Sequence, residues 1–159
     1  MTTLAANREC LAADTRVVNG SSYYHAPKIF RVGNSLIGTA GDGFACLAFV
    51  EWFKSPRRNP QVLHKLFGEN VDRDEIWILE LNPGGIYFWN GWGFPEKILD
   101  ECFAVGTGGM AALEAMRHGR TPEEAVERAL AHDENSGPPI QVEYLLPPEL
   151  TTKRKRRGT

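Results

Sequence analysis

Residues 1–6 have the sequence MTTLAA, in which an initiator methionine is followed by two threonines and a short apolar segment. Removal of Met1 would leave Thr2 with a free α-amine beside its own side-chain hydroxyl. An α-amine has a pKa of roughly 7.7–8.0 in model peptides, so near neutral pH it can take the proton of that hydroxyl. This segment therefore predicts a nucleophile and its base within one residue. The alternative is that Thr2 is an ordinary small residue behind the initiator methionine.

The segments that follow predict strands joined by tight turns. Runs of apolar residues are bounded by turn residues, and the dipeptide Gly33-Asn34 predicts a two-residue hairpin. Strands are expected at residues 2–6, 10–13, 28–32, 35–39, 76–81, 86–89, 103–105 and 140–144.

Helices are expected at residues 42–53 and 109–117, and a third begins after Thr121. Thr121, Pro122 and Glu124 have the spacing of an N-cap, a first-turn proline and a capping box. Strands, then a helix, then strands, then helices is an order that predicts an α+β fold, with two helical layers around two stacked sheets.

Five motifs carry a resemblance to a known family. They are TTLAA at 2–6, CLAADTR at 10–16, KIFRV at 28–32, LIGTAGD at 36–42 and FAVGTGG at 103–109. Together they resemble the proteasome β-subunit family of N-terminal nucleophile (Ntn) hydrolases, and within it the HslV (ClpQ)-like peptidases. The resemblance runs from Thr2 to Tyr144. It implies a four-layer αββα sandwich, threonine peptidase activity and homo-oligomeric rings.

Lys28 and Asp14 are the first candidate site residues after Thr2. Two-residue alternation places Lys28 on the same strand face as Phe30 and Val32, and a lysine among apolar residues needs a partner or a shifted pKa. The resemblance matches Lys28 to the family's catalytic lysine and Asp14 to its acidic partner. The alternatives are an edge-strand lysine that reaches water and an ordinary turn aspartate.

Asp133 is expected near a helix C-terminus, on the apolar stripe of Val126 and Leu130, where both the stripe and the helix dipole disfavour a carboxylate. The run DENSG at 133–137 resembles the Asp-x-x-Ser-Gly segment of proteasome β-subunits, a spacing that HslV lacks. The resemblance implies that Asp133 and Ser136 support the terminal amine. The alternative is a frayed helix end capped by the residues that follow.

Two glycine-rich segments complete the predicted site. The resemblance matches Gly38 to the family's oxyanion glycine, with Thr39 and Ala40 as the edge that binds substrate. It places Thr107 where relatives have a serine that contacts the amine. The alternative for residues 106–109, GTGG, is a plain turn between a strand and a helix.

The expected helix at 42–53 is apolar on all sides. Its inner and outer faces must therefore both be covered. We expect the outer cover to be another subunit and the protein to be a homo-oligomer. The alternative is burial under loops of the same chain.

Composition limits the function classes. A chain of 159 residues with 42% hydrophobic content suits one domain, expected at residues 1–147. Residues 148–159 include five basic side chains and are expected to form a disordered tail, so nucleic acid is not expected as a partner. The longest apolar run, near 46–50, is too short to span a bilayer. No leader is expected, and the predicted location is the cytoplasm.

Metal and cofactor chemistry are not expected. The three cysteines have no C-x-x-C spacing, the four histidines are scattered, and no phosphate-binding glycine-rich lysine motif occurs.

The resulting hypothesis is a self-compartmentalising threonine endopeptidase that acts on peptides or unfolded proteins, with an ATP-dependent unfoldase as a candidate partner. A non-catalytic ring subunit and a small-molecule amidase on the same scaffold are the alternatives. Thr3 is expected on the opposite strand face from Thr2, so Thr3→Ala serves as a control for modification of Thr2.

Overall fold

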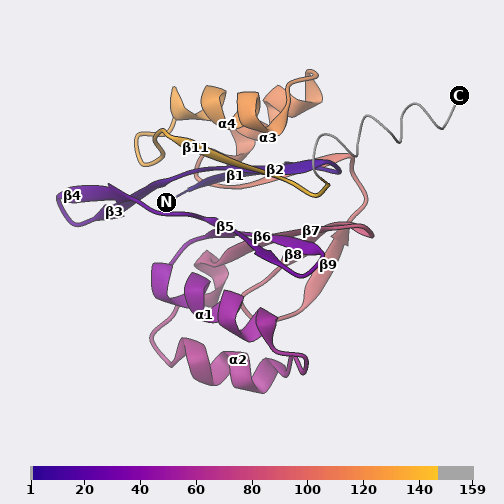
Figure 1. Cartoon of the computed structure of the whole chain (residues 1–159). Helices are drawn as coiled ribbons and strands as arrows, with labels where there is room; N and C mark the ends of the chain where they lie inside the picture. The colour runs from indigo at the N-terminus through magenta and orange to yellow at the C-terminus, as the bar shows by residue number, and fades with distance from the viewer. Residues whose placement is uncertain (1, 147–159) are drawn as a thin grey trace, which may run out of the picture.

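The computed structural model describes residues 2–146, which form a mixed α/β structure with two main sheets stacked between helices (Figure 1). The four-stranded sheet has the order β10 (Cys102–Gly106), β1 (Thr3–Asn7), β2 (Cys10–Asp14) and β11 (Ile140–Tyr144). The five-stranded sheet contains β5 (Ile29–Val32), β6 (Ser35–Ala40), β7 (Trp77–Asn82), β8 (Gly85–Trp89) and β9 (Pro95–Ile98) in chain order. All neighbouring strands in both sheets are antiparallel.

Helices cover the outer face of each main sheet. Helices α3 (Gly109–Arg117) and α4 (Pro122–Leu130) lie on the four-stranded sheet, whereas α1 (Gly43–Lys54) lies on β5 and β6, with α2 (Pro60–Phe67) packed against it (Figure 1). A short 3-10 helix, η1 (Arg73–Glu75), precedes β7. A separate hairpin of β3 (Arg16–Asn19) and β4 (Ser22–His25) extends from the body.

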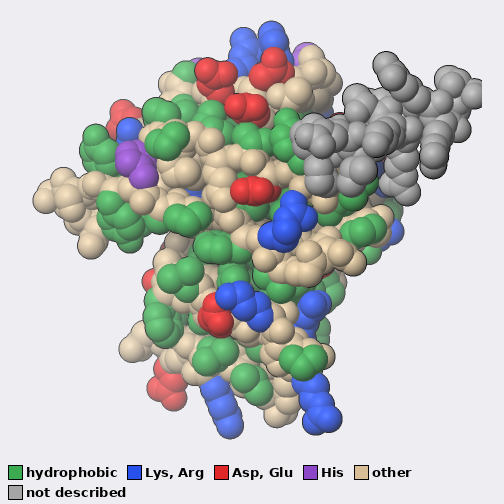
Figure 2. Space-filling model, viewed as in Figure 1, with side chains coloured by type: hydrophobic (Ala, Val, Ile, Leu, Met, Phe, Trp, Pro, Cys, Tyr) green, Lys and Arg blue, Asp and Glu red, His purple; other side chains and the backbone are tan. Residues whose placement is uncertain are grey.

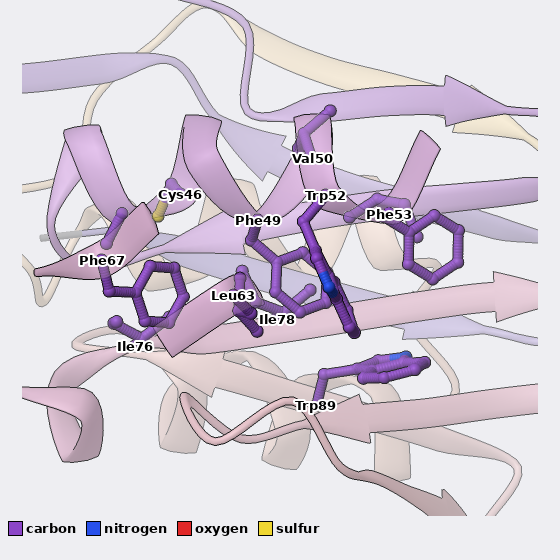
Figure 3. Close-up of a cluster of buried hydrophobic side chains, with 12 residues drawn as sticks. Cys46, Phe49, Val50, Trp52, Phe53, Leu63, Phe67, Ile76, Ile78 and Trp89 are labelled. Carbon is purple, nitrogen blue, oxygen red and sulfur yellow. The ribbon is translucent and has the colours of Figure 1, made fainter. Parts of the chain in front are cut away.

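Strand alternation distributes the buried apolar residues over three clusters. In β1, Leu4 and Ala6 pack between the two sheets, while Ala5 faces α3 and α4. The third cluster lies between the five-stranded sheet and α1, where Phe49 and Trp52 meet Trp89 (Figure 3). The residues that the four-stranded sheet contributes to the buried cluster beneath α3 and α4 are small: Ala5, Ala12 and Ala104.

Helix α1 is covered in part by the next helix of the same chain. Leu63 and Phe67 of α2 belong to the same buried cluster as Phe49, so α2 of the same chain covers one side of the helix (Figure 3). Part of the cover is therefore supplied by the same chain, and cover of the remaining surface by another subunit stays a prediction. Phe44 and Leu47 nevertheless remain 68% and 57% exposed.

The surface of the described residues carries charges of both signs. On the face shown in Figure 2, acidic and basic side chains are scattered among hydrophobic ones, without a continuous basic patch. No helix within residues 2–146 is both long enough and apolar enough to cross a membrane. The predicted basic tail lies outside the described residues.

Candidate active site

Thr2 lies just before β1 and is 5% exposed. Its carbonyl accepts a hydrogen bond of 2.9 Å from the N–H of Thr107, in the turn between β10 and α3. Gly106 in this turn has φ +93°, and a Cβ there would lie 1.9 Å from the Thr2 carbonyl oxygen. Glycine is therefore required where the turn passes Thr2, and the turn holds the backbone of the predicted nucleophile.

Asp14 is fully buried at the end of β2, and its carboxylate accepts four hydrogen bonds. Its Oδ1 accepts from the N–H of Thr3 at 2.9 Å and from Lys28 Nζ at 3.0 Å. Its Oδ2 accepts from the N–H groups of Arg16 and Gly137, each at 3.1 Å. The carboxylate is thus held in one orientation, directed at Lys28.

Lys28 is 5% exposed, and its ammonium also donates to the Arg16 carbonyl at 2.6 Å. Burial lowers the pKa of Lys28 below that of a lysine in water, although the charge and hydrogen bond of Asp14 oppose this effect. The ammonium of Lys28 is therefore a stronger acid than that of an exposed lysine. The structure therefore places a buried Lys28–Asp14 pair where the sequence predicted it.

A second cluster forms around Asp133, which is 7% exposed. Its Oδ2 accepts hydrogen bonds from the hydroxyls of Thr107 and Ser136, the latter at 2.6 Å, and its Oδ1 accepts from the N–H of Asn135. Burial alone would raise the pKa of Asp133, but the bonds from Ser136, Thr107 and Asn135 outweigh it, so the pKa is lowered. Asp133 is therefore an ionised carboxylate at neutral pH.

Thr3 belongs to the site, in contrast to the expectation. It is fully buried, its N–H bonds to Asp14, and its hydroxyl lies 3.0 Å from the Ser136 hydroxyl. Since Ser136 donates to Asp133, the Thr3 hydroxyl is the donor to Ser136. Thr3 thus links the two carboxylates, and Thr3→Ala is unsuitable as a control. Thr121, the N-cap of α4, is a suitable replacement.

A cavity of about 520 Å³ opens beside these residues. Thr2 and Lys28 line it together with Thr39 and Ala40 at the end of β6. Its lining also includes hydrophobic side chains of the β3–β4 hairpin and of α1, namely Val18, Tyr24, Phe44 and Leu47.

The prediction for Gly38 needs correction. On β6, Gly38 is opposite Ile29 of β5 on one side and Leu79 of β7 on the other. The N–H of the next residue, Thr39, bonds to the Lys28 carbonyl on the β5 side. Because successive N–H groups of a strand point to opposite sides, the Gly38 N–H points toward β7 and away from the cavity. Gly38 is instead a packing residue: a Cβ there would lie 2.9 Å from Leu11 between the sheets.

Gly41 is a second glycine, directly after the end of this strand and three residues after Gly38. It lines the cavity, and the backbone hydrogen bonds of residues 2–146 include none from its N–H. Its φ is +116°, and a Cβ would lie 2.1 Å from the Glu75 carbonyl oxygen, so only glycine fits.

Sequence reasoning missed several contributors. Arg16 and Gly137 act through backbone groups, which carry no side-chain signal. Gln141 on β11 contacts the backbone of Lys28 across the two sheets. Cys46 lines the cavity, but burial raises the pKa of its thiol to about 12, so it is not a competing nucleophile at neutral pH.

Within residues 2–146, no group of three or more His, Cys, Asp or Glu side chains is placed to hold a metal ion.

Searches by sequence gave no relatives. No family model matches the chain, and no curated protein matches it.

Solved structures with the same fold were found. BPH of Thiobacillus denitrificans has a TM-score of 0.71 at 22% identity, over 92% of this chain and 98% of that one. Eukaryotic HslV of Trypanosoma brucei has a TM-score of 0.67 at 21% identity, over 89% and 98%. Anbu of Hyphomicrobium sp. strain MC1 has a TM-score of 0.65 at 15% identity, over 89% and 81%. At these identities the likeness establishes the fold, and this chain therefore has an HslV- and proteasome-like fold.

Proposed function

We propose that this protein is a threonine endopeptidase whose nucleophile is Thr2 after removal of Met1. The observation that carries the proposal is that Thr2 and the ammonium-bearing Lys28 line one cavity, while Asp14 and Asp133, both buried, orient their surroundings. Buried charges are unfavourable without a partner, and a cluster of them beside a cavity is typical of a reactive centre.

The proposed reaction is acyl transfer. The Thr2 hydroxyl attacks a peptide carbonyl, and the α-amine of Thr2 takes the hydroxyl proton and later delivers it to the leaving amine. Water then releases the acyl-enzyme. Lys28 keeps the surroundings of the hydroxyl positive, and Asp14 orients Lys28. Gly41 replaces Gly38 as the proposed donor to the oxyanion.

The second cluster is proposed to support the amine. Asp133, Ser136, Thr107 and Thr3 form one chain of hydroxyl–carboxylate hydrogen bonds next to the start of β1. The negative carboxylate of Asp133 within this chain favours a positively charged ammonium during the reaction. Thr39 and Ala40 are proposed to flank the bound substrate.

The finer fold and assembly are also proposals. The layers of helix, sheet, sheet and helix support a four-layer αββα sandwich formed by one domain at residues 1–147. Exposed Phe44 and Leu47 on α1 support subunit contacts in a homo-oligomeric ring. Unfolded protein as substrate, an ATP-dependent unfoldase as partner and a cytoplasmic location follow from the family resemblance.

Intact mass and N-terminal sequencing, combined with a peptidase assay, test the proposal. We expect the active form to begin at Thr2, because retained Met1 would turn the required amine into an amide nitrogen without basicity. Full peptidase activity in protein that begins only at Met1 would rule out the terminal-amine mechanism.

A further inference from the structure

Gln141 connects the two main sheets next to Lys28. Its backbone pairs with Ala13 of β2 in the four-stranded sheet. Its side chain reaches the five-stranded sheet, where Oε1 accepts from the N–H groups of Lys28 at 2.9 Å and Ile29 at 3.0 Å. Its Nε2 donates to the Ile29 carbonyl at 2.9 Å. The amide thus uses both of its polar atoms on two residues of β5.

The backbone of Lys28 depends on this contact. Lys28 precedes β5, and its pairing with β6 is one-sided, since the N–H of Thr39 bonds to the Lys28 carbonyl. The N–H of Lys28 instead bonds to Gln141. The side chain of Gln141 therefore substitutes for a strand partner at the point where the sheet ends.

The same strand pair also carries Asp14. Ile140 of β11 is opposite Asp14 of β2, one residue before Gln141 in the chain. Asp14 and the anchor of the Lys28 backbone are thus fixed on adjacent strands, which sets the position of the ammonium relative to the carboxylate.

We propose that Gln141 is a positioning residue that holds Lys28 in register with Asp14, an inference that rests on the proposed function. It acts through Lys28, so its loss is expected to slow the chemical step and leave substrate binding unchanged.

The competing explanation is that Gln141 only ties the two sheets together. Arg31 offers a matched control, because it also joins β5 to the end of β11, donating to the carbonyls of Tyr144 and Leu145. Arg31 is exposed and three residues beyond Lys28. A purely structural tie should make the two sites behave alike.

The experiment compares Gln141→Met, Gln141→Asn and Arg31→Met with the unmodified chain. Methionine matches the length of glutamine but forms none of the three bonds, and asparagine keeps the amide but is one methylene too short. Thermal midpoints, kcat and KM for a fluorogenic peptide, and the rate of Thr2 acylation by a β-lactone are measured. Both Gln141 variants are expected to lose at least about tenfold in kcat and acylation rate, with KM within about twofold, because misplaced catalytic groups cost rate. For Arg31→Met, kcat, KM and the acylation rate are each expected to stay within about threefold of those of the unmodified chain.

Three outcomes would overturn the inference: folded Gln141 variants with the kcat and acylation rate of the unmodified chain, an equal loss of rate in Arg31→Met, or Gln141 variants that both fail to fold while Arg31→Met folds. Each would make Gln141 a structural tie. Absence of acylation in the unmodified chain would instead reject the proposed function, so the two failures are distinguishable.

Discussion

Replacing Lys28 with methionine is expected to slow acylation of Thr2 by about 10²–10⁴-fold, the range for loss of a positioned proton-transfer or charged group. Methionine fills the space of the lysine stem but removes the ammonium that keeps the nucleophile's surroundings positive. The rate of β-lactone labelling and the hydrolysis of a fluorogenic peptide measure the effect. Circular dichroism and size exclusion show whether fold and assembly are kept.

Lys54 is the matched control for Lys28. It also pairs with a carboxylate, Glu51, but its side chain is 52% exposed on the surface of α1. Lys54→Met is expected to retain the labelling rate of the unmodified chain. A Lys28→Met protein that is folded and labelled at the original rate would contradict a catalytic role, and a general loss of folding would favour a structural one.

Asp14→Ala is expected to lower the free energy of unfolding by about 3–5 kcal/mol, because it leaves the buried Lys28 ammonium without its counter-charge. It also removes the acceptor of three backbone N–H groups, those of Thr3, Arg16 and Gly137. Urea denaturation at neutral pH measures the loss.

A double variant separates the two contributions. Asp14→Ala with Lys28→Met removes both charges, so it is expected to be more stable than Asp14→Ala alone. Glu51→Ala, at the exposed pair with Lys54, is expected to change stability by less than about 1 kcal/mol. An Asp14→Ala effect as small as that of Glu51→Ala would contradict a buried, interdependent pair.

Local chemistry explains which elements were predictable. The hairpin at Gly33-Asn34, the capping box at Thr121 and the strand at 140–144 occur as expected, because each depends on neighbouring residues. Lys28 and Asp14 form an ion pair in the structure, and their role in a site stays a prediction. A charged residue on the apolar face of a strand is visible in the sequence and indicates a buried charge that needs a partner.

Other elements were missed for physical reasons. The β3–β4 hairpin and β9 are short and mostly exposed, so they lack apolar periodicity. Helix α2 has an N-cap at Asn59 followed by Pro60, a signal that could have revealed it.

Two details of the site depend on how the strands pair and on contacts between distant segments. The local pattern of apolar and polar residues does not determine either. The tight turn at Gly33-Asn34 sets the register between β5 and β6, and with it which N–H groups of β6 bond to β5. In this register the N–H of Gly38 points toward β7. Thr3 contacts the site through a hydrogen bond between its hydroxyl and that of Ser136, a residue that is distant in sequence. Contacts of this range appear only once the sheets and the α3–α4 layer are assembled.

The central claim is that Thr2 is an activated nucleophile, and covalent labelling tests it most directly. Protein with a confirmed Thr2 N-terminus is treated with a β-lactone. We predict one β-lactone adduct per chain, mapped by mass spectrometry to Thr2, lost in Thr2→Ala and retained in Thr121→Ala. Folded and assembled protein that stays unmodified by the β-lactone, or that is labelled equally in Thr2→Ala, would contradict the account and favour a non-catalytic subunit.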